Sequence, residues 1–154
     1  MAYFNNAATT YPKPEAVYDF MNRFYRASGA NAGRGNYEMA QGASELIAET
    51  RKLIKELLHC PSKQVIFTST ATIALNIIIQ GLIKTGIKRV YISPFEHNAV
   101  TRTLHHFEKE GKIQVYELSV STDLRYDLKR IRYQFDCNKP DIVIVSHARN
   151  VIGL

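Results

Sequence analysis

The sequence predicts an α/β protein built on a parallel sheet, because short β-branched segments alternate with helical segments over most of its 154 residues. A content of 45% hydrophobic and 22% charged residues is that of a folded globular protein. Open α/β sheets bind ligands beyond the carboxyl ends of their strands. We therefore expect the segments that follow the strands to carry the function.

Several segments have the hydrophobic periodicity of amphipathic helices. The first places Val17, Phe20 and Phe24 on one face and stops at Gly29, and a polar, glycine-bearing loop over residues 28–36 follows it. The expected helices are residues 14–28, about 37–58, 71–83, 99–109 and about 127–135.

Four short runs rich in Val, Ile, Phe and Tyr are expected to be strands: residues 64–68, 89–93, 113–119 and 141–146. Right-handed crossovers between parallel strands place the loops that follow them along one edge. Residues 69–72, 94–98 and 147–150 should therefore converge.

The strongest local pattern is the run from Phe67 to Asn76, in which hydroxyl-bearing and small residues separate a strand from an apolar helix. A helix start offers unpaired amides and partial positive charge, which suit a phosphate. Ser69, Thr70 and Thr72 could add hydroxyl donors, and Ala71 would let a ligand approach the backbone. An ordinary helix cap is the alternative. Neither a GxGxxG nor a GxxxxGK[ST] pattern occurs, which argues against a dinucleotide fold or a P-loop.

Two further polar residues follow strands. His97 could stack on an aromatic ligand or transfer a proton, or it could simply cap the next helix. Asn150 could hold a ring hydroxyl or a carboxylate, or satisfy local backbone groups.

Composition argues against other classes of protein. No apolar run approaches the roughly 20 residues of a membrane span, and the first residues have no export signal, so we expect a cytoplasmic protein without a membrane partner. The net charge of +6 is dispersed among acidic residues, which disfavours a nucleic-acid partner. Cys60 and Cys137 have no metal-ligand spacing, so no metal is expected.

Five segments, taken in order, resemble the class V aminotransferase family, whose best-known members are cysteine desulfurases. They lie at residues 3–10, 31–37, 67–76, 96–100 and 146–153. The resemblance implies a three-layer pyridoxal-phosphate (PLP) transferase large domain, here ending after about four strands. It also implies that residues 1–36 form a helix and active-site loop segment, and that residues 37–154 form the first half of the PLP-binding domain.

The resemblance implies specific roles. Thr70, Ala71 and Thr72 would hold the PLP phosphate, His97 would stack on the pyridine ring and act in catalysis, and Asn150 would bond the phenolic oxygen. Asn6, Ala7 and Arg34 would lie on the substrate side. The family usually has glycine at the position of Thr70 and often glutamate at that of Ile73, which puts the phosphate site in question if that turn needs positive φ.

The family's acidic partner of the pyridine nitrogen, its Schiff-base lysine and the desulfurase cysteine lie further along the chain than Leu154. The expected function is thus the N-terminal part of a cysteine desulfurase-like enzyme, which converts L-cysteine to alanine and a persulfide, with this chain alone inactive. An aminotransferase, a selenocysteine lyase and a non-catalytic remnant or partner-binding module stay open. The resemblance further implies a homodimer, or pairing with the missing half.

Overall fold

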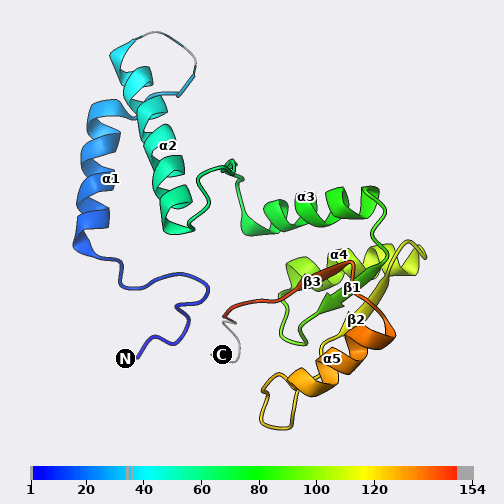
Figure 1. The fold of residues 1–154 in the computed structure, drawn as a ribbon. Coiled ribbons are helices and arrows are strands. Elements are labelled where there is room, and N and C mark those ends of the chain that lie inside the picture. Colours follow the sequence, from blue (N-terminus) through cyan, green and yellow to red (C-terminus); the bar gives the residue numbers. More distant parts are fainter. Residues whose placement is uncertain (1, 34, 36, 149–154) are drawn as a thin grey trace. The chain divides into compact units, whose positions relative to one another are not determined.

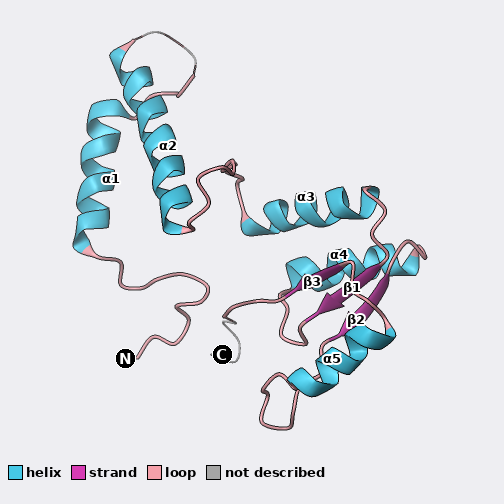
Figure 2. Cartoon of the chain, viewed as in Figure 1, coloured by secondary structure: helices cyan, strands magenta, loops and turns pink. Residues whose placement is uncertain are grey.

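Three of the four expected strands form a parallel sheet in the computed structural model of the chain (Figures 1 and 2). β1 (Arg89–Ile92) lies between β2 (Gln114–Glu117) and β3 (Ile142–Ile144). In this register Val90 lies opposite Val115 on one side and Ile142 on the other. The central strand is therefore the one that follows α3 directly in sequence.

The helices agree closely with the periodicity of the sequence. They are α1 (Glu15–Ser28), α2 (Glu38–Leu57), α3 (Ala71–Lys84), α4 (Asn98–Lys109) and α5 (Leu128–Cys137). The structure describes residues 2–33, 35 and 37–148. These divide into two units: the helical unit, residues 10–67, and the sheet unit, residues 2–9 and 68–148.

Alternation along β1 builds the core of the sheet unit in three layers. Val90 and Ile92 face one side, where they pack with Ile79 of α3 and Leu104 of α4. Tyr91 faces the other side, where α5 lies (Figure 2). Because successive side chains of a strand point to opposite faces, one four-residue strand supplies both halves of the core.

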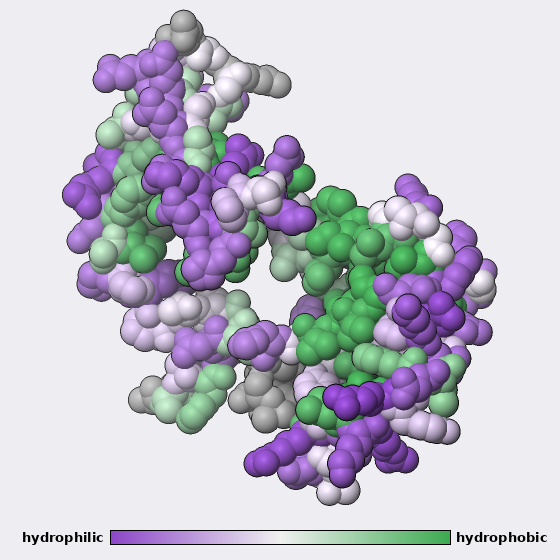
Figure 3. Space-filling view, in the orientation of Figure 1, coloured by the Kyte–Doolittle hydropathy of each residue, from purple (hydrophilic) through white to green (hydrophobic). Residues whose placement is uncertain are grey.

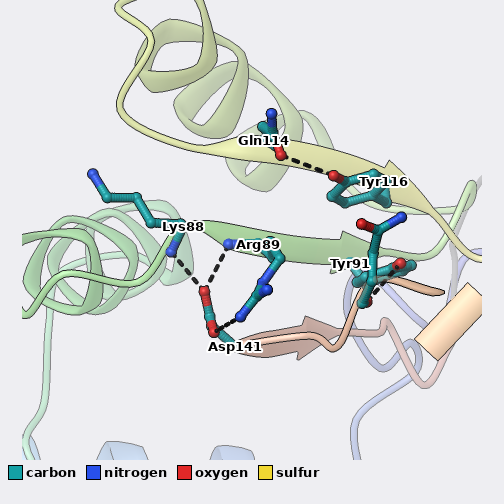
Figure 4. A network of polar contacts seen from close by, with 7 residues as sticks. Lys88, Arg89, Tyr91, Gln114, Tyr116 and Asp141 are labelled. Atoms are coloured by element: carbon teal, nitrogen blue, oxygen red, sulfur yellow. Dashed lines mark hydrogen bonds and ion pairs between the residues drawn. The ribbon is translucent and has the colours of Figure 1, made fainter. Parts of the chain in front are cut away.

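Tyr91 and Asp141 anchor the sheet with polar contacts (Figure 4). The buried hydroxyl of Tyr91 donates to the carbonyl oxygens of Gln134 and Asn138, at 3.1 and 3.0 Å, and burial raises its pKa. At the amino edge, the Asp141 carboxylate accepts from the amides of Lys88 and Arg89, both at 2.8 Å, and from the Arg89 guanidinium at 3.1 Å. These donors hold the pKa of Asp141 down, at about 2.

The prediction of a strand at residues 64–68 is wrong. The segment makes no strand pairing with the described part of the chain, and the side chain of Ile66 is 79% exposed. Arg51 holds it instead, with Nε donating to the carbonyl oxygen of Val65 at 3.1 Å and the guanidinium over the Phe67 ring. A β-branched run becomes a strand only where a neighbour accepts its backbone hydrogen bonds.

The helical unit buries little. α1 has no buried residue, and α2 buries only Ala40 and Ala43 among the residues that the structure describes. Phe20 and Phe24 stack along α1 with their ring centroids 6.2 Å apart. None of the helices in the described ranges combines the length and hydrophobicity that crossing a bilayer requires.

Candidate functional site

The start of α3 leaves backbone amides unused. Thr70 is the N-cap, and its Oγ1 accepts from the amide of Ile73 at 3.2 Å. The first helical backbone bond runs from the amide of Ala74 to the carbonyl of Thr70, so the amides of Ala71 and Thr72 lie outside the helical ladder. Thr70 has φ −150°, an extended conformation that any residue adopts, so this turn does not require glycine. The helix start thus offers two amides and nearby hydroxyls to an anion.

His97 stands at the start of α4 and caps that helix. Its Nδ1 accepts from the amide of Ala99 at 3.1 Å, which orients the ring and leaves the ring proton on Nε2. The side chain is exposed, so the cap does not bury the ring. His97 can therefore cap α4 and still present a face of its ring to a ligand.

Thr72 and His97 line the same cavity, which has a volume of about 340 Å³. Its walls come from the carboxyl ends of β1 and β3, from the start of α3 and from the N-terminal segment. The lining residues are Ala7, Ala8, Ala71, Thr72, Leu75, Phe95, His97, Ala99, Ser146 and Ala148. Loops that follow two adjacent parallel strands thus meet the start of the preceding helix.

A second hollow of about 460 Å³ continues from Thr72 and His97 along the α3–α4 pair. Asn76 crosses between these helices, because its Oδ1 accepts from Thr103 Oγ1 at 2.9 Å while its amide donates to the carbonyl of Thr72 at 2.8 Å. This contact holds the first turn of α3 against α4.

The carboxyl edge also contains a buried carboxylate, Glu96. It accepts from the Ser93 hydroxyl at 2.6 Å and from both the amide and the hydroxyl of Ser146, at 2.5 and 2.7 Å. Glu96 therefore connects the loop after β1 with the loop after β3.

The structure brings together Ala7, Ala71, Thr72 and His97 of the residues singled out from sequence. Thr70 adjoins them as the helix cap, and Asn6 is not among the lining residues. Arg34 and Asn150 lie outside the described residues.

Sequence reasoning missed Glu96 and Ser146 as structural elements of this edge, and Phe95 and Ala8 as parts of the wall. A glutamate between Phe95 and His97, directly after a buried strand, was the available signal.

No cluster of three or more His, Cys, Asp or Glu side chains suited to a metal ion occurs in the ranges that the structure covers.

Comparison with known proteins identifies the family. The model of the family described as Aminotransferase class-V matches residues 2–154. The chain belongs to the class V aminotransferases. The cysteine desulfurases belong to this family, and the family uses PLP.

Curated relatives of this class V chain are desulfurases. The "Cysteine desulfurase SufS" of Plasmodium falciparum (isolate 3D7) is 30% identical over 161 residues, which cover 99% of this chain and 29% of that protein. The "Cysteine desulfurase IscS" of Haemophilus ducreyi is 30% identical over 159 residues, 99% of this chain and 38% of that protein. This class V chain therefore spans about a third of the length of these relatives.

A solved structure shares the fold. The apo structure of cysteine desulfurase from Thermococcus onnurineus NA1 matches with a TM-score of 0.83 and 22% identity, covering 96% of this chain and 37% of that one. The α/β architecture with a small parallel sheet is thus that of the class V fold.

Proposed function

We propose that this chain supplies the phosphate-holding and ring-stacking side of a PLP site, in the N-terminal portion of a cysteine desulfurase-like enzyme. The observation that carries the proposal is the convergence of Thr72 and His97 on one cavity at the carboxyl edge of the sheet. In this proposal residues 37–154 are the first half of the PLP domain.

The residues present fit the cofactor. The amides of Ala71 and Thr72 and the hydroxyls of Thr70 and Thr72 are uncharged hydrogen-bond donors for the phosphate. The partial positive charge of the helix N-terminus adds to their attraction for it. His97, oriented by its bond to the amide of Ala99, offers an exposed ring to stack on the pyridine. A cavity of about 340 Å³ is within the usual range for small ligands.

When bound, PLP supplies an electron sink for bond cleavage at the amino-acid substrate. The role proposed for this chain in that chemistry is to bind and orient the cofactor. The helix start fixes the phosphate end, and His97 fixes the plane of the ring. Asn150 is proposed to bond the phenolic oxygen, and Asn6, Ala7 and Arg34 to lie toward the substrate.

The reaction proposed for the whole enzyme is the removal of sulfur from L-cysteine, which leaves alanine and an enzyme-bound persulfide. The desulfurase names of the relatives support it, since each matches 99% of this chain. The aminotransferase and selenocysteine lyase reactions belong to the same cofactor chemistry and are decided by assay with the respective substrates. A homodimer and a cytoplasmic location are part of the same proposal.

A binding experiment tests the cofactor site. Pyridoxamine 5′-phosphate is the suitable probe, because its amine cannot condense with surface lysines as the aldehyde of PLP can. We expect Thr72→Ala to weaken its binding about tenfold, which corresponds to the loss of a charge-assisted hydrogen bond. Titration of the probe's fluorescence measures this.

The matched control is Thr85→Ala, the same substitution at the exposed C-cap of α3. It should leave binding unchanged. Equal effects of the two variants, or a wild-type chain that binds the probe no better than it binds inorganic phosphate, would contradict the proposed site.

A sulfide-release assay tests whether residues 1–154 bind the cofactor without catalysing the reaction. The polypeptide of residues 1–154 with PLP and L-cysteine is expected to release no sulfide, since the proposed function assigns neither the Schiff-base lysine nor the reactive thiol to these residues. Release of sulfide would show that Cys60, Cys137 or a lysine of this chain takes those roles.

A further inference from the structure

Glu96 is a charged side chain in an unusual place. It is 4% exposed at the carboxyl edge of the sheet, next to His97 in sequence. A buried carboxylate is costly unless hydrogen bonds compensate its charge. No lysine or arginine of the described residues forms an ion pair with it. Hydrogen-bond donors alone must therefore stabilise Glu96 where it lies.

The donors come from the segments that follow two separate strands. Oε1 accepts from the hydroxyl of Ser93, the residue after β1, and from the amide of Ser146, which follows β3. Oε2 accepts from the hydroxyl of Ser146. The two hydroxyls donate at 2.6 and 2.7 Å, and hydrogen bonds to a carboxylate are stronger than those between neutral groups. Because both oxygens are engaged, the carboxylate cannot rotate without breaking a bond.

This geometry couples two walls of the cavity. The backbone of Glu96 leads directly into His97, and Ser146 is itself part of the lining together with Ala148. The turn on the His97 side is closed by two more bonds to Ser93, from the amide of Phe95 to its Oγ at 3.2 Å and from the amide of Glu96 to its carbonyl at 3.4 Å. A single carboxylate thus sets the spacing between the loop that carries His97 and the loop after β3.

We infer that Glu96 is a positioning residue, whose buried carboxylate holds the loops after β1 and β3 at the separation that lets His97 meet the cofactor ring. The inference rests on the proposed function for the identity of the ligand. Glu96 acts through its neighbours and does not touch the cofactor. Its loss should weaken recognition of the ring and leave recognition of the phosphate in place, because the start of α3 makes no bond to Glu96.

Hydrogen exchange tests the coupling without any ligand. In the wild-type chain the amide of Ser146 is held by the carboxylate, so it should exchange slowly. Glu96→Ala should speed its exchange at least tenfold, whereas Glu96→Gln, which keeps one acceptor oxygen and the volume, should speed it less. Glu110→Ala, at the exposed far end of α4, is the matched control and should leave this amide unchanged.

Binding tests the consequence. Glu96→Ala should weaken binding of pyridoxamine 5′-phosphate about tenfold, in line with the loss of a hydrogen-bonded charge, and leave the affinity for inorganic phosphate unchanged. The His97→Asn variant keeps the helix cap but lacks the ring. In that variant, Glu96→Ala should weaken binding of pyridoxamine 5′-phosphate by little more. Glu96→Gln and Ser146→Ala should give intermediate losses, and they carry the test if Glu96→Ala does not fold.

Each contrary outcome has a separate meaning. Unchanged exchange of the Ser146 amide in Glu96→Ala and Glu96→Gln would overturn the coupling. Glu96→Ala could instead weaken the binding of the probe and of phosphate equally, or weaken probe binding as much in the His97→Asn variant as in wild type. Either result would show that Glu96 only stabilises the fold. If the wild-type chain does not prefer the probe over phosphate, the proposed function fails, while the exchange result still decides whether Glu96 fixes the two loops.

Discussion

The sheet unit and the helical unit contain helices of similar amphipathic character but have very different cores. α1 and α4 separate their polar and apolar faces equally strongly. α4 buries Ala99, Val100 and Leu104 against the sheet, whereas α1 buries no residue at all. An amphipathic pattern thus indicates that a helix needs a surface to pack on. The sheet of β1–β3 provides that surface for α4.

The largest expected effect comes from emptying the core of the sheet unit. Leu104 is 1% exposed and packs in the α4 side of the core. We expect Leu104→Ala to lower the free energy of unfolding by about 2–5 kcal/mol, because it removes buried methyl groups and leaves a cavity. Amide exchange of β1, measured in increasing urea, reports this value for the sheet unit.

Leu57, at the end of α2 and 77% exposed, is the control in the helical unit. Leu57→Ala should change stability by less than about 0.5 kcal/mol. Similar costs for the two leucines would mean that the units do not differ in burial.

A smaller effect is expected at the hydroxyl of Tyr91. Tyr91→Phe keeps the ring, which stacks on Tyr116 and meets the edge of Phe135, but removes the donor to Gln134 and Asn138. The expected cost is about 1 kcal/mol, the net value of a hydrogen bond in a protein, measured by the same exchange experiment. Tyr25→Phe, at an exposed tyrosine of α1, should be neutral, and a cost there would contradict the contrast.

The smallest expected effect is electrostatic and depends on pH. The pKa of Asp141 lies at about 2, below its ordinary value, because the amides of Arg89 and Lys88 and the Arg89 guanidinium favour the charged form. A lowered folded-state pKa contributes stability above the unfolded pKa, and this contribution is lost as the pH falls from about 4 to about 2. Acid titration of unfolding should show the loss in wild type and not in Asp141→Asn.

Glu49→Gln is the matched control, since Glu49 pairs with Lys52 one turn away and both side chains are more than half exposed. Its acid titration should match that of wild type. A wild-type profile that is flat between pH 4 and 2 would contradict the role of Asp141.

The helices were predictable because their signals are local. Periodicity placed all five to within two residues at either end, and the caps at Thr70 and His97 follow from residue types that accept an amide hydrogen bond. The strand at residues 64–68 failed because its hydrogen-bonding neighbour cannot be read from the segment itself. The same β-branched composition gave β1 and β3, which found partners.

The candidate site was predictable in outline for a topological reason. Parallel strands bring their carboxyl ends to one edge, so Thr72 and His97 were expected together and share a cavity. Glu96 was not, because nothing in its neighbourhood shows that Ser146, fifty residues away, returns to meet it. Contacts between distant segments are where a single sequence carries the least information.

The parallel sheet has a consequence for synthesis on the ribosome. Arg89 is 52 residues from Asp141, so the middle strand is made long before its second neighbour. At roughly 5–20 residues per second, β1 waits about 3–10 s for the strand that pairs with its second edge. During that interval one edge of β1 stays unpaired, and unpaired strand edges promote association between chains.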